Sequence, residues 1–159
     1  MNFLWKTLMG KILMTFLISM VPIVELRGAL PVATGAGLDW KIAIPVAIIG
    51  NLVPVPFIII FIRKIFAWMR KQNNFLGKIV DKMENKAFSK RATIDKYGPW
   101  GLWIFVAIPL PGTGAWTGAL IAAMLDIPLK KSFPAIAFGV LTAGIIVAFV
   151  SYGAAALFF

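Results

Sequence analysis

The chain has 159 residues, 60% of them hydrophobic, and a formal net charge of +10. Soluble domains are about 45–50% apolar, and one of this length could not keep so many large side chains from water, so the composition predicts a membrane protein. The absence of cysteine and histidine excludes disulfides, thiol chemistry and the usual zinc ligands and removes the commonest general base, so we expect no enzyme, no cofactor and no metal site.

The first apolar region, residues 12–38, is interrupted by Pro22, Gly28 and Pro31. Two arms of about 13–15 residues reach roughly 20 Å each at the helical rise, which is too short to cross a bilayer twice. Non-helical backbone at membrane depth is tolerated only where protein or a wet cavity surrounds it. The region is therefore predicted to be a re-entrant helical hairpin with its broken tip near mid-membrane.

Lys6 and Lys11 followed by the run ILMTFLISMV are similar to the start of a signal peptide. A cleavage site near Ala33 and Gly35 would come after a charged pair, which is a poor match to such a site. We therefore keep the segment as part of the folded protein.

Glu25 and Arg27 lie two residues apart in the first hairpin. A charge at bilayer depth costs at least ~2.5–3.5 kcal/mol, so such residues face a cavity or a partner. Positions two apart point to opposite sides of a helix, so a mutual pair requires a non-helical tip. Two interpretations stay open: Glu25 accepts a proton and Arg27 anchors an anion, or Arg27 caps carbonyls at the break and Glu25 neutralises it. Gly28 and Pro31 belong to this candidate site.

The next apolar stretch, residues 40–62, is long enough to span a bilayer, with kinks expected at Pro45, Pro54 and Pro56. Asp39 precedes it and is expected to cap the helix that begins at Trp40. Asn51 either satisfies a freed carbonyl or lines the same cavity as Glu25.

Residues 63–97 form a basic segment. Ten of the sixteen basic residues lie between Arg63 and Lys96 against three acidic ones, which gives this stretch +7. Such a segment between apolar stretches is typical of a cytoplasmic loop facing anionic lipid headgroups. No nucleic-acid motif accompanies the charge, so we expect membrane lipids as partners and no nucleic acid. Apolar residues from Phe75 to Ala87 fall on one helical face, which indicates an amphipathic helix that lies on the inner membrane surface or packs over the bundle.

The second interrupted region, residues 99–128, is predicted to be another re-entrant hairpin. Pro109 and Pro111 end a helix, and Gly112, Thr113 and Gly114 permit a tight turn. A half-helix then begins near Ala115, whose amides, with the Thr113 and Thr117 hydroxyls, form a site for anions or polar groups. The alternative is that the glycines and prolines only make the hairpin possible. Trp116 either stacks on a substrate or packs at an interface, and Asp126 is expected to cap the next helix.

Residues 132–159 carry no charge and are the clearest predicted span. Lys130 and Lys131 precede it, as the positive-inside rule favours for a cytoplasmic start. If residues 63–97 are cytoplasmic, the second hairpin opens to the cytoplasm and the first opens outward. Lys6 and Lys11 then lie on the disfavoured side, unless a helix at residues 1–11 or 3–21 removes the conflict.

An internal repeat relates the two halves. A shift of 87 residues aligns Pro22 with Pro109 and Leu38-Asp39 with Leu125-Asp126. After a two-residue insertion, Pro45 aligns with Pro134 and Gly50 with Gly139. A hairpin returns to its own side whereas a span crosses, so the copies have opposite orientations, as is typical of transporters.

The predicted fold class is therefore an all-α integral membrane protein with a single transmembrane domain, residues 1–159. Its two inverted repeats, about 12–62 and about 98–159, each contain a re-entrant hairpin and a span. The basic linker 63–97 joins them. A chain with so few spans encloses little on its own, so we expect a homodimer.

The stretches VELRGALP (24–31) and FVAIPLPGTGAWTGA (105–119) resemble the bacterial and archaeal family of small multidrug export proteins, and the resemblance covers nearly the whole chain. More distantly, the two hairpins are similar to the DedA superfamily, whose members have an acidic residue at the first tip and arginines at the second, and for which transport of lipids or polyprenyl phosphates is proposed. Glu25 matches the acidic residue. The second hairpin lacks an arginine, so Arg27 would supply the positive charge.

The expected function is export across the cytoplasmic (inner) membrane, coupled to protons at Glu25. The substrate would be a small amphipathic or anionic molecule, or a lipid-linked phosphate, held between the two tips. The alternative is a structural or assembly factor of the membrane in which Glu25 and Arg27 form a closed pair. A lipid enzyme is the weakest option because histidine and cysteine are absent.

Overall fold

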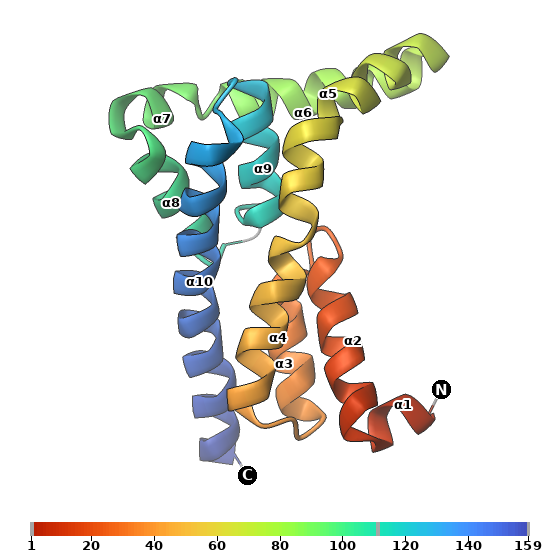
Figure 1. Ribbon diagram of the computed structural model, residues 1–159, viewed down its shortest axis with the longest axis vertical. Helices are drawn as coiled ribbons and strands as arrows, with labels where there is room; N and C mark the ends of the chain where they lie inside the picture. Colours follow the sequence, from red (N-terminus) through yellow and green to blue (C-terminus); the bar gives the residue numbers. More distant parts are fainter. Residues whose placement is uncertain (1, 111, 159) are drawn as a thin grey trace.

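The computed structural model describes residues 2–110 and 112–158, and this part of the chain is helical without strands. Its helices are α1 (Asn2–Lys6), α2 (Leu8–Met20), α3 (Glu25–Gly35), α4 (Trp40–Leu52), α5 (Pro54–Gln72), α6 (Asn74–Phe88), α7 (Arg91–Tyr97), α8 (Pro99–Ala107), α9 (Ala115–Met124) and α10 (Leu129–Phe158). Two long helical columns and two short hairpins make up most of the body (Figure 1).

Two helices of the described chain are long and apolar enough to cross a membrane, namely Trp40–Gln72, in which α5 continues α4, and Leu129–Leu157. Their most apolar windows have mean hydropathies of 2.3 and 2.4. At the helical rise they extend about 45–50 Å, well beyond the roughly 30 Å hydrocarbon core. Pro54 begins α5, a position where a missing amide costs little. Both predicted spans are therefore candidate membrane helices; the first extends ten residues beyond its predicted end, to Gln72, and the second begins three residues earlier than predicted, at Leu129.

Two helical hairpins approach each other from opposite ends of the molecule. The arms α2 and α3 join through residues 21–24, the arms α8 and α9 join through residues 108–114, and both tips lie at mid-height (Figure 1). These arms contain 13, 11, 9 and 10 residues, so each is about 14–20 Å long and shorter than a hydrocarbon core.

The same local cause ends the first arm of each hairpin. Val21 and Ile108 adopt extended backbone, with ψ of 128° and 117°, and each precedes a proline, Pro22 or Pro109. A proline disfavours helical backbone in the residue before it. Pro22 and Pro109 therefore place the two breaks, and a helix end at each was predicted from the sequence.

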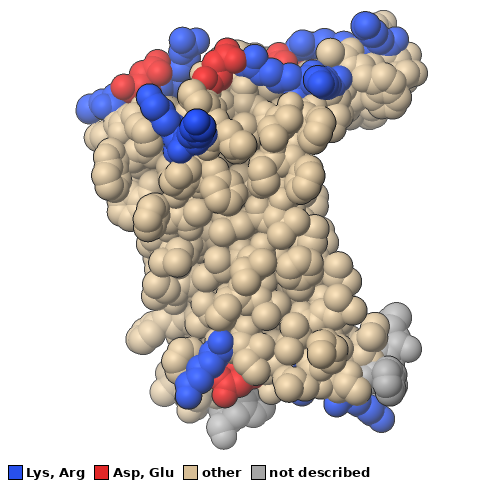
Figure 2. Space-filling view, in the orientation of Figure 1, with Lys and Arg blue, Asp and Glu red and all other residues tan. Residues whose placement is uncertain are grey.

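Charged side chains gather at the two ends of the molecule and leave a wide band between them free of surface charge in this view (Figure 2). Large apolar side chains are exposed on the helices that cross this band, including Phe57, Phe138 and Phe149 at 60%, 65% and 81%. Exposed apolar surface of this extent indicates contact with lipid. Together with the two long apolar helices, it identifies a membrane protein.

The basic linker packs over one end of the bundle. Val80 and Ala87 of α6 are 0% and 3% exposed and belong to the hydrophobic core. Arg70 of α5 donates to Asp81 (2.8 Å) and Glu84 (2.7 Å) of α6. Of the two interpretations open for this helix, the packing one is confirmed.

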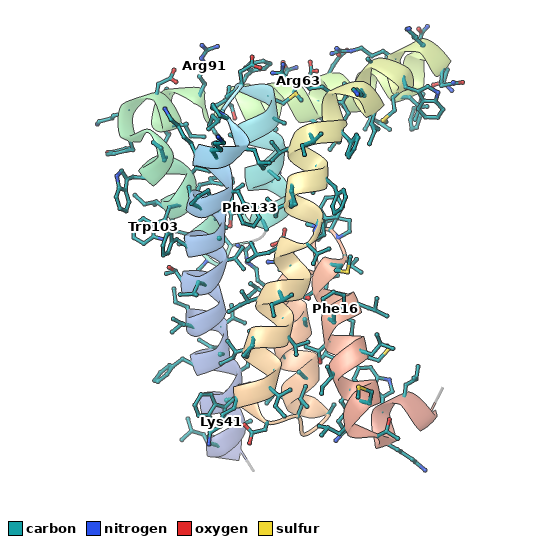
Figure 3. All side chains as sticks on the ribbon, in the orientation of Figure 1. Phe16, Lys41, Arg63, Arg91, Trp103 and Phe133 are labelled. Atoms are coloured by element: carbon teal, nitrogen blue, oxygen red, sulfur yellow. The ribbon has the colours of Figure 1, made fainter. Side chains whose placement is uncertain are left out.

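Gly50 and Gly139, which the sequence alignment of the two halves places opposite each other, both lie in close helix contacts. A Cβ on Gly50 of α4 would overlap the Ser19 hydroxyl of α2 and lie 2.6 Å from the Phe16 carbonyl oxygen. A Cβ on Gly139 of α10 would lie 2.6 Å from Val106 Cβ of α8 and 3.0 Å from the Trp103 carbonyl oxygen. A shift of 87 residues relates Phe16 to Trp103, both labelled in Figure 3, and Ser19 to Val106.

The exits of the hairpins are held by donors from the long helices. Arg63 of α5 donates to the Ala123 carbonyl at the end of α9 (2.8 Å) and forms an ion pair with Asp126 (2.7 Å). Tyr152 of α10 donates to the Leu38 carbonyl beyond α3 (2.9 Å). The 89-residue shift that aligns Gly50 with Gly139 also relates Arg63 to Tyr152.

The two aspartates at these exits have different roles. Asp39 caps α4, with its carboxylate 2.8 Å from the Lys41 amide, so that prediction is confirmed. The prediction for Asp126 is wrong, because α10 begins only at Leu129. Asp126 instead has a φ of +57° and pairs with Arg63.

Gly139→Ala tests the close packing of α8 on α10, with Gly153→Ala as its matched control in the same helix. Nothing lies within 4 Å of a Cβ at Gly153, so the control gains up to about 1 kcal/mol of helix propensity. Gly139→Ala forces α8 away and costs about 1–3 kcal/mol. Thermal unfolding midpoints of the purified proteins in detergent should fall for the first and hold or rise for the second. An equal rise of the unfolding midpoint in both variants would contradict the close packing of α8 on α10.

Candidate functional site

The site begins with Glu25, the first residue of α3, which is 4% exposed. Its carboxylate accepts from the backbone amides of Ala115 (3.3 Å) and Trp116 (3.1 Å) in the first turn of α9. A helix N-terminus has unpaired amides and a partial positive charge. Glu25 therefore caps a helix of the opposite hairpin.

Gly114 makes this close approach possible. A Cβ at this position would lie 2.8 Å from Cδ and 2.9 Å from Oε1 of Glu25. The backbone of Gly114, with φ of +144°, also suits only glycine. This residue therefore has a specific structural requirement that the sequence, which offered only a general turn signal, did not reveal.

Arg27 caps the other arm of the same hairpin, helix α8. Its Nη1 donates to the Leu110 and Thr113 carbonyls, and its Nη2 donates to the carbonyls of Ile108 (3.1 Å) and Val106 (3.5 Å). These carbonyls lie at and beyond the end of α8, where a helix has unpaired acceptors and a partial negative charge. The forked guanidinium reaches several of them at once, which a lysine ammonium cannot do.

Glu25 and Arg27 thus bind opposite helix ends, and no ion pair between them is found in the described chain. The acid meets the positive end of α9 and the base meets the negative end of α8. In this conformation Arg27 caps carbonyls at a break, as one sequence interpretation supposes, although the break belongs to the other hairpin. The α9 amides expected to hold a substrate are occupied by Glu25.

Asn51 of α4 faces the same cluster. It is 1% exposed and lines a small void together with Glu25, Arg27, Gly114 and helix α10. This space is too small to hold a water molecule. Within the described residues, Asn51 Oδ1 and Arg27 Nε are buried without a hydrogen-bond partner, and buried polar atoms of this kind need an explanation.

Two further tip residues join the cluster. The Trp116 indole donates to the Met20 carbonyl at the end of α2 (3.1 Å), so the second hairpin caps the first in return. The Thr113 hydroxyl donates to the carbonyls of Ile108 (2.7 Å) and Leu110 (2.8 Å) and steadies the turn.

The remaining predicted residues lie at the edge of this cluster or away from it. Thr117 is half-buried on α9, and Gly28 lies within α3, where a Cβ would overlap the Val24 side chain. Pro31, inside α3, and Pro109, in the loop after α8, are exposed. Pro111 lies outside the described residues.

Lys86 is a contributor that the sequence did not indicate. Gly112 is exposed, and a Cβ there would lie 3.2 Å from the Lys86 ammonium of α6. The linker helix therefore places a cation beside the turn of the second hairpin. Its sequence signal, one lysine among many, offers no way to distinguish it from its neighbours.

The site residues lie within a stretch that matches a known family. The sequence model described as "Putative small multi-drug export protein" matches residues 25–146. The chain belongs to this family. The match begins at Glu25, directly after the first tip, and contains the second tip, whereas no curated protein and no solved structure matches the chain.

Arg27→Lys tests the capping of α8, with Arg91→Lys as control. The lysine keeps the charge but satisfies fewer of the carbonyls, and lost hydrogen bonds to a charged group cost about 1.5–3 kcal/mol. Arg91 forms only an exposed pair with Asp95 at 3.4 Å, a kind of contact that contributes little. The unfolding midpoint in detergent should fall for Arg27→Lys alone. An unchanged midpoint would show that Arg27 does not stabilise the tip.

Proposed function

We propose that the chain is an exporter in which the two hairpin tips form the central gate, seen here closed. The observation that carries the proposal is the exchange of caps between the tips. Glu25 and Arg27 of one hairpin hold both helix ends of the other, and Trp116 holds an end of the first. Membership of an export family and two apolar candidate spans support a transporter.

The proposed architecture is a pair of inverted repeats with re-entrant hairpins. It is supported by arms too short to cross the bilayer and by tips that meet at mid-height (Figure 1). It is also supported by the matched contacts of Gly50 and Gly139 and by the matched donors Arg63 and Tyr152. Each donor joins the long helix of one repeat to the hairpin of the other.

Opening of the gate would separate the tips and free the groups that now cap each other. A proton on the Glu25 carboxylate removes the charge that holds the α9 amides, which are then available to an anionic or polar group of the substrate. Arg27 would hold the same group, and Lys86 would attract it from the basic side. The proposed substrate is therefore a small amphipathic or anionic molecule or a lipid-linked phosphate.

Orientation in the inner membrane is part of the proposal, with the end that contains α6 and α7 in the cytoplasm. The charged residues at that end greatly outnumber those at the other in the view of Figure 2, and lysine and arginine favour the cytoplasmic side. The wide apolar band is also available to a second copy, so we keep the homodimer as a proposal.

Labelling of single cysteines tests this orientation, because the native chain contains no cysteine. Arg91 and Lys41 lie at opposite ends of the molecule (Figure 3). In intact cells, an impermeant thiol reagent should label Lys41→Cys, and Arg91→Cys should react only after the membrane is opened. Labelling of both from outside would contradict a single orientation with the linker inside.

Flux through reconstituted vesicles tests the gate. With a pH gradient, the wild type should move lipid phosphates or amphipathic dyes, and Glu25→Gln, which keeps the shape but not the titratable charge, should lose at least about tenfold in rate. Asp95→Asn is the control, since Asp95 is exposed on α7. Arg27→Lys should slow the flux as well. If Glu25→Gln and Arg27→Lys fold normally and transport at the wild-type rate, the proposal of a central site between the tips is wrong.

The alternative, a structural or assembly factor of the membrane, is favoured by one observation. The cluster around Glu25, Arg27 and Asn51 contains no water-sized space, as expected for a pair that only ties the hairpins together. In that case vesicles with the wild type show no flux, and the only effect of the tip variants is a lower unfolding midpoint.

A further inference from the structure

A groove opens between α8 and α10 near the charged end of the molecule. Trp100 and Trp103 of α8 form one wall, and Lys131, Phe138 and Thr142 of α10 line the other. The groove holds about 340 Å³ of space. Trp103 lies at one edge of the molecule in Figure 3, and Trp100 and Phe138 of the same groove are 69% and 65% exposed, so the groove opens on the outer surface of the bundle and not into the gate.

The related groove in the first half of the chain has a different lining. It lies between α2 and α4, and its walls include Leu13, Phe16 and Ile49. The repeat relates these residues to Trp100, Trp103 and Phe138. The two grooves therefore occupy equivalent places in the two halves of the chain. Side chains that differ in polarity between the grooves are not required for helix packing.

The additions in the second groove are all polar or aromatic. Leu13 and Phe16 are replaced by tryptophans, whereas Lys131 and Thr142 correspond to Ile42 and Val53 in the first half. In the first half of the chain the aligned positions all hold apolar side chains, so the helices can pack there without polar groups. Lys131 and the tryptophans thus indicate a ligand that is charged at one end and apolar along its length.

The geometry within the groove fits such a ligand. Trp100 and Trp103 meet edge to face, with ring centroids 5.8 Å apart. The Trp103 indole donates to the Thr142 hydroxyl (3.3 Å), which in turn donates to the Phe138 carbonyl (2.8 Å). The Trp103 indole and the Thr142 hydroxyl are therefore both paired within the wall, while the exposed Lys131 ammonium is available to a ligand.

We propose that this groove binds one anionic phospholipid from the leaflet at the basic end. The phosphate pairs with Lys131, and an acyl chain lies against Trp100, Trp103 and Phe138. Charge complementarity decides for an anionic lipid, because the one charge that lines the groove is positive. Tryptophan at headgroup depth fits the same placement. The lipid here is a bound component of the protein and differs from the exported molecule.

The test is native mass spectrometry of the full-length protein released from vesicles of phosphatidylglycerol and phosphatidylcholine with identical acyl chains. The wild type should keep phosphatidylglycerol in preference. Lys131→Gln should lower its retention about fivefold, the worth of one basic residue near an anionic surface, and leave phosphatidylcholine unchanged. Lys130→Gln removes the same charge from the adjacent residue, which does not line the groove, and should change retention less than twofold.

A second pair of variants tests the apolar wall. Phe138→Ser should lower the retention of both lipids, whereas Phe149→Ser, an exposed phenylalanine of α10 outside this groove, should not. Both side chains are largely exposed, so both variants should fold.

Three outcomes would overturn the proposal. If Lys131→Gln and Lys130→Gln lose phosphatidylglycerol equally, its retention depends on the net charge of the protein and not on this groove. If the wild type retains phosphatidylglycerol and phosphatidylcholine equally, the anionic headgroup is not recognised. If inorganic phosphate alone displaces the lipid, the site binds a free anion instead of a phospholipid. Because export does not enter this test, a Lys131→Gln protein that loses the lipid and still transports leaves the proposed function standing.

Discussion

A helix that ends inside a bilayer has backbone amides or carbonyls that no water can satisfy. Four helix ends meet at the centre of this protein, and three of them are satisfied by side chains from the opposite hairpin. Glu25 binds the α9 amides, Arg27 binds the carbonyls after α8, and Trp116 binds the last carbonyl of α2. Each side chain has the polarity that its helix end requires. The meeting of the two hairpins depends on this exchange.

The same exchange explains why charges are present in so apolar a chain. A buried carboxylate or guanidinium alone is costly, but each here faces the partial charge of a helix end at close range. The backbone is forced at this place, with φ of +75° at Ile23 and +51° at Glu25, conformations that cost energy in residues other than glycine. Backbone strain of this kind is typical of functional sites and of segments that switch between conformations, which is consistent with a gate.

The sequence predicts much of the fold from local causes. Prolines fix the backbone of the residue before them, so the breaks at Val21 and Ile108 were foreseeable, and Asp39 has the usual side chain of a helix cap. Residues whose partners are remote were not foreseeable. Arg63 was grouped with the lipid-facing charges of the linker, yet it binds carbonyls of α9, because nothing local indicates which helix end lies beside it. Asp126 shares a Leu-Asp pair with Asp39, but the next helix starts later and the aspartate turns to Arg63.

The sequence separation of the capping partners has a consequence for biogenesis. Glu25 and Arg27 are joined to groups 79 to 91 residues further along the chain, so they leave the ribosome long before any partner exists. Until α9 has been made, the first hairpin contains two charges without the helix ends that stabilise them, and contacts of such long separation form late. The two hairpins can therefore form their central contacts only after α9 has been made, so the order of synthesis sets the order in which this cluster assembles.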